Sequence, residues 1–116
     1  MDLRSVVVDW WRRTLLTRPR IRRARYYDSV SDLPTSIPRN EIAVVRSGEI
    51  MKWAAFECPC GHNHRILINL DPQRRVSWRI TGDPPTLSPS IDSRGTRRCH
   101  FLLNSGRVTW VRDRLP

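Results

Sequence analysis

Short runs in which apolar and polar residues alternate dominate the chain after residue 40. Alternation places every second side chain on the same face of a strand, so each run predicts a half-buried β-strand. The turn Asn104-Ser105-Gly106 stands between two such runs, which is typical of a hairpin. Residues 83–90 hold three prolines and predict no central strand. The predicted strands lie at 42–46, 50–57, 65–70, 75–80, 100–103 and 107–111.

The pattern before residue 40 is different. In residues 1–18 apolar side chains recur at helical spacing, with Asp2 placed to cap a helix and Pro19 placed to end it. Residues 19–39 are rich in arginine and proline and predict a linker arm. We therefore expect an N-terminal amphipathic helix, a linker arm and a β domain over residues 40–116. The predicted class is mainly β (α+β), with a small antiparallel β domain behind the helix.

The charge of the chain is strongly positive, which bears on its partners. The 116 residues suffice for one domain, and they carry 21 Lys+Arg against 11 Asp+Glu, a net charge of +10. All the basic residues but Lys52 are arginines, whose planar groups make paired contacts with carboxylate or phosphate. Residues 12–25 hold seven arginines and no acid. Because apolar periodicity ends at Leu16, we expect residues 12–25 to be dispensable for the folding of the β domain.

The sequence excludes a membrane span and a secretory signal. No apolar run approaches the 18 residues that a spanning helix needs, and the first residues lack an apolar core with a cleavage site. Three cysteines are an odd number, which argues against a framework of disulfides. Reduced thiols in a cytoplasmic protein are the expected state.

Every cysteine and histidine lies in one of two short segments. The first is Cys-Pro-Cys-Gly-His-Asn-His at 58–64, and the second is the pair at 99–100. Zn²⁺ prefers thiolate and imidazole donors in a tetrahedron, so the clustering predicts one bound Zn²⁺ per chain. Cys58, Cys60 and Cys99 are the first three expected ligands. A histidine completes the set in a structural site, and a water does so in a catalytic one. The candidates for the fourth donor are His62, His64 and His100.

Several short motifs share an order and spacing with a known family. They are 55–61 (AFECPCG), 78–79 (WR), 85–90 (PTLSPS), 99–101 (CHF) and 106–108 (GRV). In these motifs the chain resembles a small domain family of bacteria and phages, the BubE-like proteins. Members accompany bacterial ubiquitin-like conjugation operons as peptidases that act on the modifier. The resemblance covers about residues 32–112, and it implies as partners a ubiquitin-like protein and its conjugation enzymes.

The resemblance also implies roles for particular residues. The family often has a third cysteine where this chain has His62, and histidine is also a zinc donor, so the resemblance favours His62 over His64 as the fourth ligand. The family's Pro-Ser and His-Phe motifs match Ser90 and His100. These positions imply a serine nucleophile with a histidine base, beside a structural zinc with four ligands. The third, acidic member of such a triad is left open among Asp83, Asp92 and Asp113.

Other functions fit the same residues. In a metallopeptidase the zinc keeps an open position for water, with Glu57 as the base. A non-enzymatic basic zinc module would contact nucleic acid or an acidic protein. A structural subunit would dock on a partner through Trp10 and Trp11. The segment 86–90 itself is either a catalytic loop or a turn whose hydroxyls cap backbone groups.

Overall fold

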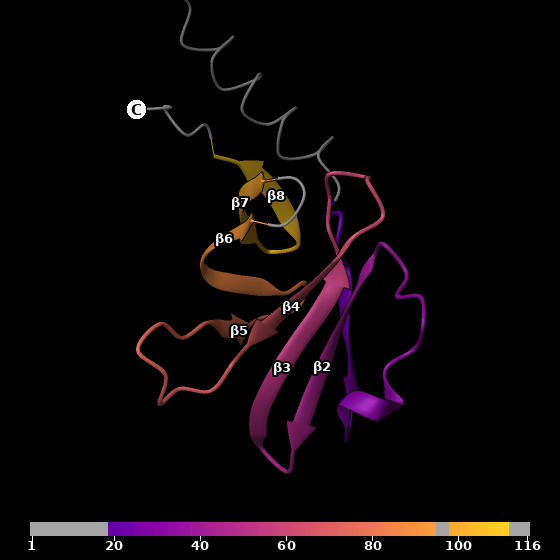
Figure 1. Ribbon diagram of the computed structural model, residues 1–116, viewed down its shortest axis with the longest axis vertical. Coiled ribbons are helices and arrows are strands. Elements are labelled where there is room, and N and C mark those ends of the chain that lie inside the picture. The colour runs from indigo at the N-terminus through magenta and orange to yellow at the C-terminus, as the bar shows by residue number, and fades with distance from the viewer. Residues whose placement is uncertain (1–18, 95–97, 112–116) are drawn as a thin grey trace, which may run out of the picture.

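The structure, a computed structural model, describes residues 19–94 and 98–111, which form eight strands in two sheets (Figure 1). Both sheets have four strands, and in each the strands lie side by side in chain order. The first sheet consists of β1 (Arg23–Tyr27), β2 (Glu41–Ser47), β3 (Ile50–Glu57) and β4 (Arg65–Asn69). The second consists of β5 (Arg79–Thr81), β6 (Thr86–Arg94), β7 (Arg98–Asn104) and β8 (Arg107–Trp110).

The first sheet is covered on both faces at its centre. Residues 41–45 of β2 are all buried, where an alternating pattern would expose every second one. One face of the sheet packs against the second sheet. On the other face Ile37 packs against Ala43 and Ala55, with Tyr27 and Leu33 beside them. This second small core explains why β2 is a continuous apolar run, as strands buried on both faces are.

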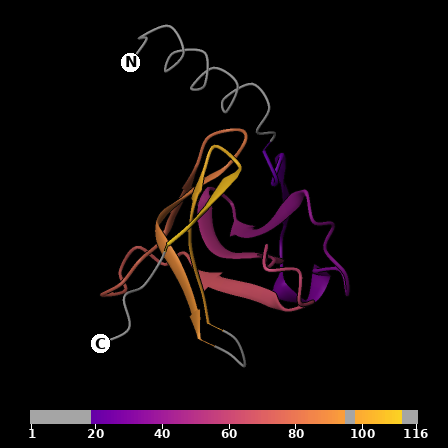
Figure 2. The same ribbon diagram turned by 90° about the horizontal axis from the view of Figure 1, so that it is seen from above.

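The inner faces of the two sheets share one hydrophobic core. Figure 2 shows the orange and yellow strands of the second sheet on one side and the magenta strands of the first on the other. The rings of Phe56 in β3 and Phe101 in β7 meet edge to face at 6.2 Å between centroids. Such a pair contributes about 0.5–1.5 kcal/mol beyond the apolar area it buries. In β7 the alternation is regular, with Cys99, Phe101 and Leu103 buried and their neighbours more exposed.

Several predicted strands are confirmed. The structure contains β3 with the predicted bounds, it contains β2 and β4 within a residue of theirs, and it contains the C-terminal hairpin. The prediction of a strand at 75–80 is wrong for most of its length, because β5 begins at Arg79. The exclusion of a central strand from 83–90 is also wrong, since β6 lies between β5 and β7. Pro89 is tolerated there because the β6–β7 register shifts between Leu87 and Ile91, so its missing N–H costs no regular ladder bond.

The predicted α+β class with an antiparallel sheet is wrong. Helix in the described residues is limited to one 3₁₀ turn, η1 (Val30–Asp32), and the first sheet is mixed because β1 runs parallel to β2. The helix expected over residues 1–18 lies outside the described residues. No helix within 19–94 and 98–111 is long and apolar enough to cross a membrane.

The segment expected to be a linker arm is instead part of the fold. Ile21 is buried in the main core, and its N–H donates to the carbonyl oxygen of Gly106 at 3.0 Å. A side chain at Gly106 would collide with the Ile21 carbonyl oxygen, so only glycine permits this approach. In β1, Arg23 and Arg25 bind the buried carboxylate of Glu41 at 2.9 and 3.3 Å. Two arginines of the basic stretch therefore neutralise a carboxylate within the domain.

Candidate functional site: a cysteine–histidine cluster and a serine–histidine pair

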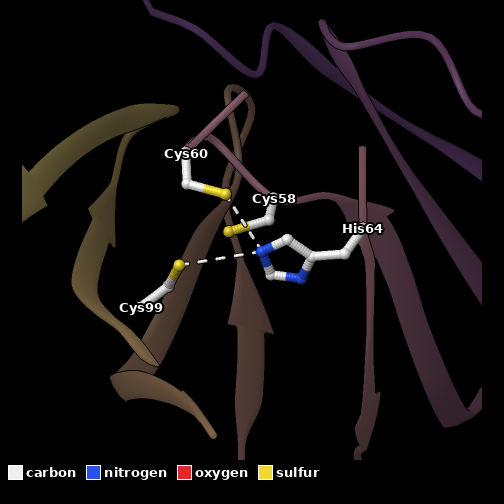
Figure 3. A group of neighbouring side chains, drawn as sticks. All are labelled: Cys58, Cys60, His64 and Cys99. Atoms are coloured by element: carbon white, nitrogen blue, oxygen red, sulfur yellow. Dashed lines mark hydrogen bonds between the residues drawn. The ribbon is translucent and has the colours of Figure 1, made fainter. Parts of the chain in front are cut away.

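Three cysteines and one histidine meet at one end of the core (Figure 3). Cys58 directly follows β3, Cys60 lies in the β3–β4 loop and His64 directly precedes β4. Cys99 comes from β7 in the other sheet. The ligand atoms of all four residues lie within 4.8 Å of one another. The cluster thus joins the two sheets.

The β3–β4 loop folds back so that its donors converge. The Cys58 N–H donates to the His64 carbonyl oxygen at 2.9 Å, which continues the β3–β4 ladder by one pair. Gly61 and Asn63 take positive φ angles of 78° and 54° between these ends. Glycine and asparagine adopt this region more readily than other residues. The resulting turn points Cys60 and His64 toward the same space.

The donor set fits Zn²⁺. His64 Nε2 lies 3.0 Å from Cys60 Sγ and 3.6 Å from Cys99 Sγ. Zinc bonds of roughly 2.3 Å to sulfur and 2.0 Å to nitrogen require tetrahedron edges of about 3.5–3.8 Å, near this spacing. Cys58 and Cys99 are buried and Cys60 is half-buried. Three thiols with one imidazole form a common structural zinc set.

The thiols of the cluster differ in acidity. Burial raises the pKa of Cys58 to about 12. Burial also acts to raise the pKa of Cys60, but hydrogen bonds from the backbone and ring of His62 outweigh it. Further hydrogen bonds from the thiols of Cys58 and Cys99 act in the same direction, and the pKa of Cys60 is lowered to about 6. Cys60 therefore favours the thiolate, the form that binds metals.

The structure brings together Cys58, Cys60 and Cys99, the first three expected ligands, and adds His64. His62, the expected fourth ligand, is not in this group, and its Nδ1 donates to the Cys60 carbonyl oxygen at 2.9 Å. The resemblance favoured His62 because of its alignment with a family cysteine. The register of the β3–β4 hairpin is the better guide to the fourth ligand, because it places His64 opposite Cys58 at the start of the loop.

Two further polar side chains, Ser90 and His100, lie together on the outer face of the second sheet. Ser90 Oγ in β6 is 3.0 Å from His100 Nε2 in β7, and both residues are half-buried. In the β6–β7 ladder His100 is opposite Asp92, so Ser90 is its diagonal neighbour on the same face. Adjacent residues of a strand face opposite ways, which directs Cys99 to the cluster and His100 to the serine. His100 is thus a partner of Ser90 and not a member of the four-residue cluster.

The backbone around this pair is held by further bonds. The indole Nε1–H of Trp78 donates to the carbonyl oxygen of Ser90 at 3.2 Å. The Val111 N–H donates to the carbonyl oxygen of His100 at 2.9 Å, which extends the β7–β8 ladder. Both members of the pair are therefore carried by rigid strands and not by loops.

The acidic residues that the sequence offered as a third member occupy different places. Asp92 is opposite His100, and its carboxylate oxygens accept bonds of 3.2–3.3 Å from Arg94 and Arg98. The hydrogen bond from Arg98 is the main cause that lowers the pKa of Asp92. Asp83 lies in the loop between β5 and β6. Asp113 lies outside the described residues.

Comparison with known proteins identifies the family of this chain. The family profile described as "Bacterial ubiquitination-like system serine protease (BubE)" matches residues 29–111, more than half of the sequence. This match confirms the resemblance seen in the motifs. Neither the curated proteins nor the solved structures give a significant match. The matched segment includes the serine–histidine pair and all four residues of the cluster, and the chain belongs to the BubE family, the serine proteases of a bacterial ubiquitination-like system.

Proposed function

We propose that this chain is a serine peptidase that processes or deconjugates a bacterial ubiquitin-like protein, with Ser90 as nucleophile and His100 as general base. The observation that carries the proposal is the 3.0 Å distance between Ser90 Oγ and His100 Nε2. A serine hydroxyl is a weak nucleophile until an adjacent base removes its proton, and this distance is within hydrogen-bond reach. The family description names the same class of enzyme.

The chemistry follows from the two atoms. As Ser90 Oγ attacks the carbonyl carbon of the scissile bond, its proton passes to His100 Nε2. The imidazolium then donates that proton to the departing nitrogen, and the amide bond breaks to leave an acyl-serine ester. A water molecule gives a proton to Nε2 and attacks the ester carbonyl. Release of the acid restores the serine hydroxyl and the neutral imidazole.

The scaffold supports this role by fixing both groups. Ser90 is held through its carbonyl oxygen by Trp78, and His100 is held in the central strand β7. A reacting pair that is already in position avoids the entropy cost of assembling it during the reaction. Half-burial of both residues keeps them accessible to a substrate from the outer face of the sheet.

The cluster of Cys58, Cys60, His64 and Cys99 is suited to a structural zinc. Four protein donors complete a tetrahedron, whereas catalytic zinc sites have three protein ligands and a water. When bound, the ion would supply folding energy and hold the two sheets together. Because Cys99 directly precedes His100 in β7, its ligation would fix the strand that carries the base. This reading disfavours the metallopeptidase alternative with Glu57 as base.

The partner and compartment follow from charge and thiol chemistry. The net charge of +10 favours an acidic surface on the ubiquitin-like protein or on its conjugation enzymes. The three cysteines of the cluster form no disulfide in the structure, and ligand cysteines must stay reduced. We therefore place the protein in the reducing cytoplasm.

The test is cleavage of a ubiquitin-like protein from the same bacterial system that carries extra residues after its C-terminus. Ser90→Ala is expected to lower kcat by about 10³-fold or more, and His100→Ala by a similar factor. The double variant is expected to be hardly worse than either, because a nucleophile and its base act as one unit. Glu57→Gln is the matched variant for the metallopeptidase. Loss of activity in Glu57→Gln with full activity in Ser90→Ala would overturn the proposal.

A further inference from the structure

A groove of about 410 Å³ lies between the two sheets, along the strand β6 that carries Ser90. Its first wall is β4, and its second wall is the stretch of β6 from Ile91 to Ser93. Trp53 and Trp78 also line it. The groove therefore separates the outer edge of one sheet from a strand of the other.

The β4 wall presents unpaired backbone groups. Among the described residues β4 is the last strand of its sheet, so its outer edge pairs with no strand there. The Leu70 N–H donates to the carbonyl oxygen of Lys52, just beyond the end of β4. In the β3–β4 register, this bond means that the backbone groups of the even-numbered residues of β4 point toward β3. Backbone groups alternate in direction along an antiparallel strand. Those of Arg65, Leu67 and Asn69 therefore point outward.

The β6 wall is open in the same way. β5 pairs with β6 only as far as Ser88, and within the described residues no strand follows it along that side. The Val111–His100 hydrogen bond shows that the backbone N–H and C=O of His100 point toward β8 and not toward β6. Asp92 is opposite His100 in the β6–β7 ladder, so its backbone groups make no bond to β7 and face away from it. The carbonyl oxygen of Ser90 faces the same side, where Trp78 binds it.

We infer that this groove binds the extended tail of the substrate as an added strand on the edge of β4. The inference rests on the proposed function, and it names how the substrate is held. A peptide strand gains affinity from main-chain hydrogen bonds to a sheet edge, with pockets for alternate side chains. Leu67, in the middle of this edge, is 51% exposed.

The groove lies beside the strand that carries the nucleophile, so a tail bound there would pass close to the backbone of Ser90. Trp78 lines the groove and also binds the backbone of Ser90. Asp92 lines it two residues beyond the serine. A second hollow of about 490 Å³ adjoins the groove, because Trp53 and Asn69 line both.

The experiment measures binding without cleavage. A fluorescent peptide with the sequence of the ubiquitin-like protein's tail is titrated by fluorescence anisotropy against the full chain carrying Ser90→Ala. Leu67→Pro added to this background removes an outward N–H but no bond to β3, and it is expected to weaken binding about tenfold. The matched control Leu67→Thr retains the N–H and is expected to change Kd by less than about threefold.

A second series leaves the protein unchanged. Peptides with a single N-methyl group at successive positions are expected to bind about tenfold more weakly at every second position, because only alternate N–H groups of a strand face β4. If Leu67→Pro does not fold, this series alone tests whether the tail binds as a strand on the edge of β4. Equal binding of all the methylated peptides, or no binding of the unmodified tail, would overturn the inference. Periodic weakening with no cleavage by the unmodified enzyme would support the groove and defeat the proposed function.

Discussion

Replacing His64 and His62 one at a time by alanine distinguishes a metal ligand from its near neighbour. The two residues share a loop and a side-chain type, so each variant is the control for the other. His64 Nε2 lies 3.0 Å from Cys60 Sγ and 3.6 Å from Cys99 Sγ, whereas His62 Nδ1 donates to a backbone carbonyl. We expect His64→Ala to impair zinc binding, and His62→Ala, which removes a hydrogen bond to Cys60 but no ligand, to have a much smaller effect.

The size of the effect follows from the number of donors. Structural zinc contributes roughly 10–16 kcal/mol in small domains, so one ligand of four is worth about 3 kcal/mol. A loss of that size lowers the unfolding temperature of a domain this long by about 15 °C. Complete removal of the ion by a chelator costs about as much as the whole stability of a typical domain, which is about 5–15 kcal/mol, and should unfold it.

The assay combines metal analysis of the purified chain with thermal unfolding followed by circular dichroism. We expect one zinc per chain in the unaltered protein and in His62→Ala, and weakened retention on dialysis in His64→Ala. A chain with less than half an equivalent of zinc and unchanged folding would refute the metal site. Equal stability of the His64→Ala and unaltered proteins, with a large loss in His62→Ala, would refute the choice of ligand.

Three further predictions concern single side chains elsewhere in the fold. Trp78→Phe keeps an aromatic side chain but loses the indole N–H that donates to the carbonyl oxygen of Ser90. The serine then loses this anchor, so kcat in steady-state cleavage should fall by about tenfold. Ile21→Ala should cost about 2–5 kcal/mol in urea unfolding, because this side chain is buried; cutting off β1 should cost more. Asp92→Asn should lower the unfolding temperature at neutral pH but not in strong acid, where the two proteins should melt alike. The bond to Arg98 lowers the pKa of Asp92, so its stabilisation is present above the unfolded-state value and is lost as pH falls through the folded-state value.

The strands that could be predicted from the sequence are those fixed by local signals. β3 and the C-terminal hairpin combine apolar runs with turn residues beside them in the chain, and both were predicted. β1 could not be, because its sequence RARYY has no clear alternation. Its place depends on a parallel partner that lies more than ten residues away, and on the buried carboxylate of Glu41 that binds its arginines.

The rule that proline avoids central strands misled the prediction of β6. The rule concerns the loss of a ladder bond, and the shift in register after Leu87 removes that cost at Pro89. Whether a proline meets a regular ladder or a bulge depends on the partner strand, which the local sequence does not reveal. The serine beside this proline was nevertheless singled out, because the family motif marks it.

The candidate site was predictable in its residue types more than in its contacts. The concentration of cysteine and histidine in two segments indicated a metal cluster, and the structure brings residues of both segments together. The choice between His62 and His64 depends on which residue continues the β3–β4 ladder, a property of the folded hairpin. The pairing of Ser90 with His100 came from the resemblance, and its role in catalysis is a proposal that the structure supports through one distance.

The central claim is that His100 activates Ser90, and covalent labelling tests it most directly. A fluorophosphonate reacts when a serine oxygen attacks its phosphorus and fluoride leaves, so its rate reports an activated hydroxyl. Mass spectrometry of the intact chain and its peptides should find one adduct, on Ser90. We expect His100→Ala to slow its formation by about 10³-fold or more. Absence of the adduct, or an undiminished rate in His100→Ala, would contradict the account.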